Sequence, residues 1–445
     1  MTLPRKIINA ICDNGGSIFE VGGAVRDEFL GITDHKDHDF LVTGIPQDTL
    51  VSLLGSFGKA DLVGQSFGVI KLHIGGAVFD IALPRKEKST GQGHKDFEVI
   101  IDHTLSVEDD LARRDFTMNA TAINLSDKSI IDPFDGQKAI ERKEIDIVFE
   151  DAFKDDPLRM LRAVQFAARL KFWLSDNTFN SIKEHAHLIK TISGERIFEE
   201  IVKIMERSEF PSRAFKLMKD TGLLEHLIPE FIPTIGIEQP NKFHSLDVFD
   251  HIMATLDSVP TLKLNIRLAA LLHDIGKPDT LFIDSAGIPH FHSHEDVGAD
   301  IAEKILLRWK APKSLIENVC CLIREHMFEL KFDITPKAIR RLLARVDKAS
   351  IFDLLDLRMG DRIASGKPLL PMGKVGKFRA LIDAELADPA FSIKDLKISG
   401  HDIIALGIKP GPKIGEILSR LLERVMDNPE INTKEQLFSI VQKEV

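Results

Sequence analysis

Two aspartates separated by one residue stand at the entrance to an apolar segment. In the run DHKDHDFLVTG, Asp37 and Asp39 precede an apolar stretch that reads as a strand. Residues i and i+2 of a strand point to the same side, so we expect the two carboxylates to converge. Such acids repel each other unless a cation neutralises them, and Mg²⁺ suits both oxygen ligands and phosphates. The pattern predicts a metal site that handles phosphate.

A third acid and a glycine pair extend this pattern. Asp80 lies within the apolar run AVFDIA, and a buried strand acid is costly unless a metal or an arginine neutralises it. Gly22 and Gly23 stand between a predicted strand, residues 17–21, and a predicted helix, where a ligand can approach the backbone and Arg26 can add a contact. A glycine pair alone is usually only a turn. Together these features predict two-metal phosphoryl or nucleotidyl transfer.

Polar residues also gather at the start of a helix predicted within DAFKDDPLRMLRAVQFAARL. Asp156 precedes Pro157, which is a typical helix start. Spacings of three place Asp156, Arg159 and Arg162 on one face, with apolar residues on the other. A carboxylate beside a guanidinium could match the hydrogen-bonding edge of a base, and a further arginine could hold triphosphate. A capped surface helix with salt bridges explains the same pattern.

The segment upstream of this helix supplies two more features. Residues 85–97 are polar, contain glycines and read as a mobile loop. Arg113 and Arg114 then close a short predicted helix, where they serve either triphosphate or the helix dipole.

Histidines and aspartates form a second constellation in the C-terminal half. His273 and Asp274 are adjacent at the end of a predicted helix, and an adjacent pair can serve two ions. The remaining candidates are distributed along the chain as His251, His290, His292, His294, His326 and Asp361. Imidazoles and carboxylates are good ligands for divalent transition metals. A single histidine is more often structural, so the prediction depends on the whole set.

Composition bounds the class of protein. The chain has 445 residues, 44% hydrophobic and 28% charged, which is typical of a globular protein with several domains. Its net charge of −10 argues against an evenly basic surface that coats nucleic acid. Lysines and arginines do gather between Arg308 and Lys348, as an RNA-facing stripe or as a solvated helical face. Without a signal-type or membrane-spanning run or a disulfide framework, we expect a cytoplasmic protein.

Several motifs in the first 230 or so residues together resemble one family. VGGAVRD, DHD, LARRDFTMNA, DPFDG, KDDPLRMLRAVQFAARL and SGERIFEEIVK occur in the order found in class II tRNA nucleotidyltransferases, the CCA-adding enzymes of the polymerase β superfamily. The resemblance implies an α/β nucleotidyltransferase head followed by mainly α-helical neck, body, HD and tail domains. The expected boundaries are 1–137 for the head, 138–235 for neck and body, 236–365 for the HD domain and 366–445 for a tail that binds tRNA.

The resemblance also implies roles for single residues. Asp37 and Asp39 would bind Mg²⁺, and Asp80 would be the third catalytic acid. The expected nucleotide-binding residues are Gly23, Arg26, Arg114 and Arg162, with Asp156 and Arg159 as an amino-acid template for cytosine or adenine. Two positions depart from the family: Asp155 replaces a more usual glutamate, and Gln165 replaces a common arginine. Gln165 cannot supply charge, so we expect weaker triphosphate binding there unless a nearby lysine substitutes.

The histidine constellation resembles the HD phosphohydrolase superfamily. By that resemblance the core ligands are His251, His273, Asp274 and Asp361, with His294 and His326 available for a second ion. Some CCA-adding enzymes carry such a domain with phosphatase and 2′,3′-cyclic phosphodiesterase activity, while in others it is vestigial.

The predicted activity is addition of CCA to tRNA from CTP and ATP without a nucleic-acid template. Addition of CC only, A only or poly(A) remains open, as does a protein that acts mainly as an HD phosphohydrolase. A noncatalytic RNA-binding or chaperone protein is a third possibility. The expected partners are tRNA, CTP and ATP, without a membrane, and no pattern indicates an oligomeric state.

Overall fold

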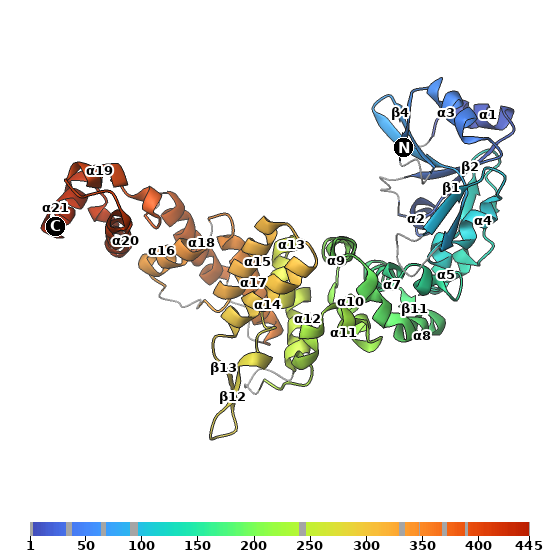
Figure 1. The fold of residues 1–445 in the computed structure, drawn as a ribbon. Helices are drawn as coiled ribbons and strands as arrows, with labels where there is room; N and C mark the ends of the chain where they lie inside the picture. The colour runs from blue at the N-terminus through green and yellow to red at the C-terminus, as the bar shows by residue number, and fades with distance from the viewer. Residues whose placement is uncertain are drawn as a thin grey trace. The chain divides into compact units, whose positions relative to one another are not determined.

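The computed structural model describes residues 3–32, 38–63, 68–89, 97–239, 246–328, 334–346, 348–366, 372–387 and 390–444. The chain divides into two compact units, Met1–Ile232 and Pro233–Val445, which are described separately below. Figure 1 labels their helices and strands. Within the described ranges, no helix has the length and the apolar run that crossing a membrane requires.

The N-terminal unit begins with a seven-stranded sheet in the order β3-β4-β5-β2-β1-β8-β9. Its strands are β1 (Ser17–Val21), β2 (Asp39–Thr43), β3 (Lys59–Val63), β4 (Val69–Ile74), β5 (Ala77–Ala82), β8 (Ala122–Asn124) and β9 (Ile130–Ile131). Strands β2 and β5 run parallel, and the other neighbours are antiparallel. The parallel pair lies at the centre of the sheet, where it sets the register of two acids.

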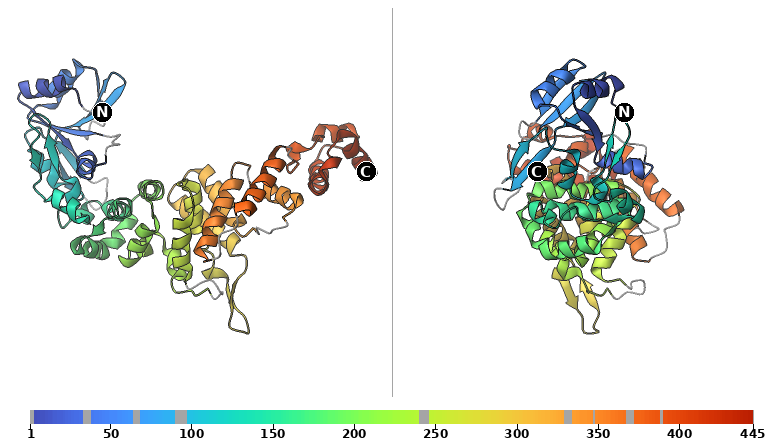
Figure 2. Two further views of the ribbon diagram at one scale, coloured as in Figure 1. Left: turned by 180° about the vertical axis from the view of Figure 1, so that it is seen from behind. Right: turned by 90° about the vertical axis from the view of Figure 1, so that its right-hand side faces the viewer.

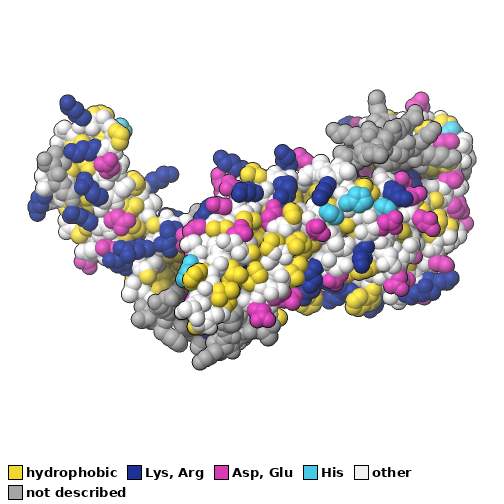
Figure 3. All heavy atoms as spheres, turned by 60° about the horizontal axis from the view of Figure 1, so that its bottom comes forward, with side chains coloured by type: hydrophobic (Ala, Val, Ile, Leu, Met, Phe, Trp, Pro, Cys, Tyr) yellow, Lys and Arg dark blue, Asp and Glu magenta, His cyan; other side chains and the backbone are white. Residues whose placement is uncertain are grey.

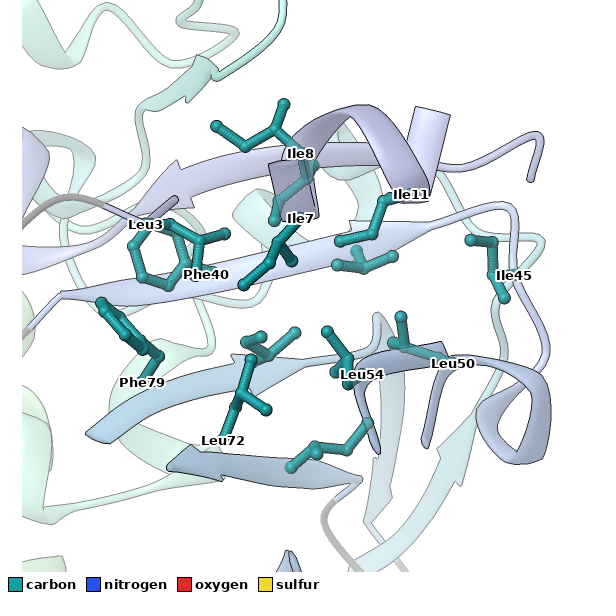
Figure 4. Packing of buried hydrophobic residues seen from close by; sticks show 14 of the residues in the cluster. Leu3, Ile7, Ile8, Ile11, Phe40, Ile45, Leu50, Leu54, Leu72 and Phe79 are labelled. Atoms are coloured by element: carbon teal, nitrogen blue, oxygen red, sulfur yellow. The ribbon is translucent and has the colours of Figure 1, made fainter. Parts of the chain in front are cut away.

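Hydrophobic side chains cover both faces of this sheet. On one face, helices α1 (Arg5–Asp13) and α3 (Gln47–Gly55) bury isoleucines and leucines against the strands. Figure 4 shows this cluster, with Ile7, Ile11, Phe40, Leu50, Leu54, Leu72 and Phe79 among the labelled residues. On the other face, α4 (Val107–Ala112) packs Val107 and Leu111 against Phe19 and Leu41. The sheet therefore holds its strand ends rigidly.

The segment 85–97 is not simply a loop. Residues Arg85–Ser89 form β6 and pair with β7 (Phe97–Ile101) as an antiparallel hairpin, while residues 90–96 lie outside the described chain. The prediction overlooked the β-branched and aromatic residues from Phe97 to Ile101, which favour a strand. The loop prediction for residues 90–96 therefore stays a prediction.

The rest of this unit is helical, apart from the short parallel pair β10 (Glu144–Ile145) and β11 (Trp173–Leu174). The helices are α2 (Gly23–Phe29), α5 (Gly136–Arg142), α6 (Ala152–Asp155), α7 (Leu158–Leu170), α8 (Asp176–His185), α9 (Gly194–Arg207), α10 (Ser212–Asp220) and α11 (Leu223–Leu227). Helix α7 packs against both α9 and α10 (Figure 2). Most residues of α7 are buried, so it is not a surface helix.

The C-terminal unit is also helical, with one small hairpin of β12 (Leu281–Ile283) and β13 (Pro289–Phe291). Its helices are α12 (Val248–Ser258), α13 (Leu264–Leu272), α14 (His294–Arg308), α15 (Lys313–Glu325), α16 (Pro336–Arg345), α17 (Ile351–Ala364), α18 (Met372–Ala387), α19 (Gly400–Ala405), α20 (Pro412–Asp427) and α21 (Lys434–Glu444). Helices α12, α13, α15 and α17 pack together, while α19 to α21 share a separate apolar cluster. The fold class predicted from sequence, an α/β head followed by helical domains, is confirmed.

Candidate functional site

Two predicted acids lie side by side on the central strands of the sheet. Asp39 opens β2 and stands opposite Asp80 in the parallel pairing of β2 with β5. Asp37 lies outside the described residues, so its predicted convergence with Asp39 remains a prediction. The expectation that Asp80 is buried was wrong, because its side chain is 40% exposed and pairs with Lys71 at 3.2 Å. Strand alternation buries Phe79 and Ile81 and turns Asp80 to the opposite face.

A glycine with an unusual backbone conformation lies next to these acids. Gly22 adopts φ 78° and ψ −138° between β1 and α2. A Cβ atom there would lie 2.9 Å from Nη1 of Arg114 and 3.5 Å from Oδ2 of Asp39. Only glycine adopts this conformation without strain, and only glycine leaves room for the two charged groups.

A cavity of about 680 Å³ opens beside the acids. Six of the predicted residues line this cavity: Gly23, Arg26, Asp39, Asp80, Arg114 and Arg162. It also contains Lys71, Asp115, Asn119, Gln165, Phe166, Arg169, Lys203 and Arg207, which we did not predict as site residues. Asp115 belongs to the motif LARRDFTMNA, which was a usable signal. Lys203 of α9 ends the motif SGERIFEEIVK, which was a usable signal as well, whereas Arg207 lies outside the named motifs and has only the spacing of an exposed helical face.

The arginines of the α2 and α4 region are held by hydrogen bonds. Arg26 is 3% exposed, donates to Asn119 Oδ1 at 2.8 Å and pairs with Asp27 at 2.6 Å. Arg114 pairs with Asp110 at 3.2 Å, and its Nε is buried without a hydrogen-bond partner. These contacts fix both guanidinium groups at the cavity before any ligand arrives, which limits the entropy lost on binding an anion.

Helix α7 contributes Arg162 through an ion pair with Asp115. The Asp115 carboxylate accepts from Arg162 at 2.7 and 2.9 Å and from Asn119 at 3.0 Å. Burial by itself would raise the pKa of Asp115, but the charge of Arg162 and the hydrogen bonds hold that pKa below its usual value. The pair joins α7 to the loop after α4 and orients Arg162 toward the cavity.

Asp156 and Arg159 are close in sequence to Arg162, which lines the cavity, but neither of them lines the cavity itself. Asp156 Oδ1 accepts from the backbone of Leu158 at 3.2 Å, so the acid does help to start α7. Its Oδ2 pairs with Arg196 of α9 at 2.8 Å. Arg159 donates to the carbonyl of Arg113 at 2.9 Å and stacks over Phe149. Both template candidates therefore already have partners.

The histidine constellation assembles in the C-terminal unit. His251, His273, Asp274, His326 and Asp361 form two overlapping groups with ligand atoms close enough to share an ion: His251, His273 and Asp361, and His273, Asp274 and His326. Asp274 is 2% exposed and lies 3.2 Å from Nε2 of both His273 and His294. A cavity of about 340 Å³ opens beside them. His290 instead pairs with Asp284, and His292 stacks on His290.

The hydrogen bonds of these histidines fix their tautomers. Nδ1 faces a backbone carbonyl in His273 at 2.9 Å, in His294 at 2.7 Å and in His326 at 2.6 Å. A neutral ring that donates from Nδ1 has an unprotonated Nε2. Yet Nε2 of His294 lies 3.4 Å from Nε2 of His326, where two acceptors would repel each other. Burial, reinforced by His273, lowers the pKa of His326 to about 3, so its ring is neutral. A shared cation fits this arrangement.

Several of the basic residues between Arg308 and Lys348 pair with acids. Arg340 is 6% exposed and pairs with Glu385, and Arg345 pairs with Glu325. Lys337 and Arg341 share Asp427. These contacts support the solvated or packed helical face. Lysine and arginine side chains also stand over the segment with α20 and α21, at the left of Figure 3.

Comparisons with known proteins agree with these features. Three family profiles match: poly(A) polymerase head domain over residues 18–146, probable RNA and SrmB-binding site of polymerase A over 171–234, and tRNA nucleotidyltransferase domain 2 over 295–441. An A-adding tRNA nucleotidyltransferase of Deinococcus radiodurans is 32% identical, over 95% of this chain and 94% of its own. A multifunctional CCA protein of Nitrosococcus oceani is 31% identical, over 91% and 96%.

A solved structure extends the similarity to the fold. The CCA-adding enzyme of Bacillus stearothermophilus in complex with CTP has a TM-score of 0.72 and 25% identity, covering 99% of this chain and 96% of the other. Nucleotidyltransferases of this family use divalent metal ions. The chain thus belongs to the family of tRNA nucleotidyltransferases that contains the CCA-adding enzymes.

Proposed function

We propose that this enzyme restores the CCA end of tRNA by adding C, C and A from CTP and ATP. The observation that carries the proposal is the pairing of Asp39 with Asp80 at the floor of a cavity lined by arginines and lysines. The tRNA 3′-oxygen attacks the α-phosphorus, the bond from that phosphorus to the bridging oxygen breaks, and pyrophosphate leaves. Relatives named multifunctional CCA proteins and a relative solved with CTP support this substrate choice.

The residues at the cavity fit a magnesium-dependent reaction. Adjacent carboxylates are hard oxygen donors, so Asp39 and Asp80, with Asp37, would hold Mg²⁺. When bound, Mg²⁺ lowers the pKa of the attacking hydroxyl and neutralises triphosphate charge. Arg26 and Arg114 stabilise charge on the phosphates through fixed N–H donors. Gly22 keeps these donors and Asp39 close together without a side chain between them.

We assign base selection to Asp156 and Arg159. Each would exchange a present contact for a base: Asp156 would release Arg196, and Arg159 would release the carbonyl of Arg113. A base with the wrong donor and acceptor pattern would leave these polar groups unpaired, which rejects it strongly. Asp156→Ala would remove one of these polar groups and is therefore expected to reduce discrimination between CTP and UTP.

The domain assignment follows the same proposal. Residues 1–137 would carry catalysis, 138–235 nucleotide selection and RNA contacts, 236–365 the HD site and 366–445 tRNA binding. The profile match over residues 171–234, described as a probable RNA-binding site, supports the second of these roles.

Nucleotide incorporation tests the proposal and its closest alternatives. A tRNA that ends at the discriminator base is offered with Mg²⁺ and CTP, ATP or both. Addition of C, C and A in order, abolished by Asp39→Ala, supports the proposal. Addition of A only to a tRNA that already ends in CC would instead give this chain the specificity named for its Deinococcus relative. No incorporation on any substrate would refute the transferase proposal.

A second candidate function belongs to the histidine site. The three histidines whose Nε2 atoms face Asp274, namely His273, His294 and His326, favour a bound divalent transition metal and hydrolysis of phosphate esters. The test is hydrolysis of 2′,3′-cyclic AMP and p-nitrophenyl phosphate by the full chain with Mn²⁺ or Ni²⁺. His273→Ala should abolish hydrolysis, whereas His292→Ala, an exposed histidine outside both groups, should not. Equal rates for the two variants would refute this function.

A further inference from the structure

One wall of the nucleotide cavity contains a buried donor that has no acceptor. Gln165 on α7 is 2% exposed, lines the cavity, and its Nε2 makes no hydrogen bond. An unsatisfied buried donor costs about 1–3 kcal/mol. A ligand atom that accepts a hydrogen bond would satisfy Gln165, but the amide supplies no charge.

Cations from two helices surround this donor. Arg169 of α7 and Lys203 and Arg207 of α9 line the same cavity. Lys203 pairs with Glu200 at 2.7 Å, and Arg169 pairs with Asp27 at 3.9 Å. Arg207 is exposed and has no ion pair with any described side chain. This wall of the cavity, formed by Gln165, Arg169, Lys203 and Arg207, therefore keeps an uncompensated positive charge.

The electrostatics of Arg169 show that these cations affect one another. Burial lowers the pKa of Arg169, and the like charge of Arg26 lowers it further, as does that of Arg207, while Asp27 opposes them. Cations held together in this way repel one another, and a bound anion with several charges removes that cost. We therefore expect this wall to bind a polyanion in preference to a neutral group.

We propose that Arg207 and Lys203 bind the terminal phosphates of the incoming nucleotide and supply the charge that Gln165 lacks. The Gln165 amide would donate to an oxygen of the same polyphosphate. This proposal rests on the proposed transferase function and names residues that determine its affinity for triphosphate. A free polyphosphate fits better than the RNA backbone, because a small group reaches the buried amide of Gln165 inside the cavity.

Pyrophosphate binding tests the wall without requiring turnover. Calorimetry with Mg²⁺ and pyrophosphate would compare the full-length wild type with Arg207→Gln, Lys203→Met and Gln165→Leu. Lys216→Gln on α10 is the matched control, since Lys216 is exposed and does not line the cavity. We expect a loss of about tenfold or more in affinity for each removed cation, since one charge-assisted hydrogen bond contributes about 1.5–3 kcal/mol. CMP affinity and the control should stay unchanged.

The outcomes separate this inference from the transferase proposal. In incorporation assays the KM for CTP and ATP should rise in the cation variants, with no rise in the KM for tRNA. Wild-type pyrophosphate affinity in Arg207→Gln and Lys203→Met would overturn the inference even if the enzyme adds CCA. A rise in the KM for tRNA alone would assign the cations to RNA and also overturn it. Failure of the wild type to incorporate nucleotides would refute the transferase proposal, while pyrophosphate binding still tests the wall.

Discussion

Replacing Gly22 by alanine tests how the cavity holds its charged groups together. The residue has φ 78° and ψ −138°, a conformation that side chains other than glycine rarely adopt. An added Cβ would stand 2.9 Å from Nη1 of Arg114, which is closer than carbon and nitrogen normally approach, and 3.5 Å from Oδ2 of Asp39. Gly22→Ala therefore combines backbone strain with displacement of Arg114.

The two effects have different magnitudes and different readouts. Backbone strain at a glycine-only conformation costs about 1–3 kcal/mol. For a unit of this size each kcal/mol lowers the Tm by about 2–4 °C. Displacing Arg114 removes a charge-assisted hydrogen bond to phosphate, and such a bond contributes about 1.5–3 kcal/mol. That loss corresponds to a fall of roughly 10- to 150-fold in kcat/KM for CTP.

Gly15→Ala is the matched control. Gly15 also has a positive φ of 80°, but a Cβ there meets no atom within 4 Å. Thermal unfolding and steady-state incorporation of CTP would be measured on both variants. We expect both to lose stability and only Gly22→Ala to lose the additional catalytic efficiency. If both variants keep the same kcat/KM, Gly22 does not act through Arg114 and Asp39, and this reasoning about the cavity is wrong.

The remaining predictions concern the Asp115 ion pair and the histidine site. Arg162→Met leaves the buried Asp115 carboxylate without its cation, so urea unfolding should show a loss of about 1–3 kcal/mol. The pKa of Asp115 is lowered on folding, so its contribution to stability is complete above its unfolded pKa of about 3.9 and is lost as pH falls through the lower folded pKa. The stability gap between wild type and Arg162→Met should therefore narrow in acid. Asp361→Asn should remove metal from the histidine site, as measured by elemental analysis, and leave incorporation of CTP unchanged.

Each of these predictions can be contradicted by a specific measurement. A wild-type urea midpoint in Arg162→Met would mean that solvent or Asn119 satisfies Asp115 fully. A stability gap that widens in acid would reverse the sign argued for its pKa. Unchanged metal content in Asp361→Asn would remove Asp361 from the proposed ligand set.

Local spacing predicted the parts of the site that depend on neighbours in sequence. The start of α7 follows from Asp156 and Pro157, because a capping acid before proline needs no distant contact. The burial of Leu161 and Val164 follows from helical periodicity. The helical periodicity of residues 182–204 and 212–227 does not produce continuous helices. A 3-10 segment, Ala186–Thr191, interrupts the first, and Gly222 with φ 75° interrupts the second.

The position of Asp80 within a strand was predicted correctly, but its burial was not. The apolar neighbours of Asp80 indicated burial, but they belong to the face of β5 that packs on the helices. The opposite face of the strand points to the cavity, which side chains do not fill. Alternation along a strand predicts which residues share a face, but which face meets packed helices depends on the rest of the fold. The lysine partner on β4 follows from strand register, which local sequence did not specify.

The wall formed by α7 and α9 depends on tertiary packing even more strongly. The family resemblance implied an arginine where this chain has Gln165, and it predicted weaker triphosphate binding there unless a nearby lysine substitutes. Lys203 ends the motif SGERIFEEIVK, but its spacing from Arg207 alone does not distinguish the two residues from other cations of an amphipathic helix. Their selection follows from the packing of α9 on α7, which brings residues about forty positions apart into one cavity. In the proposal above, the loss of a charge on α7 is compensated by cations of α9, and the folded arrangement identifies which cations of α9 reach the cavity.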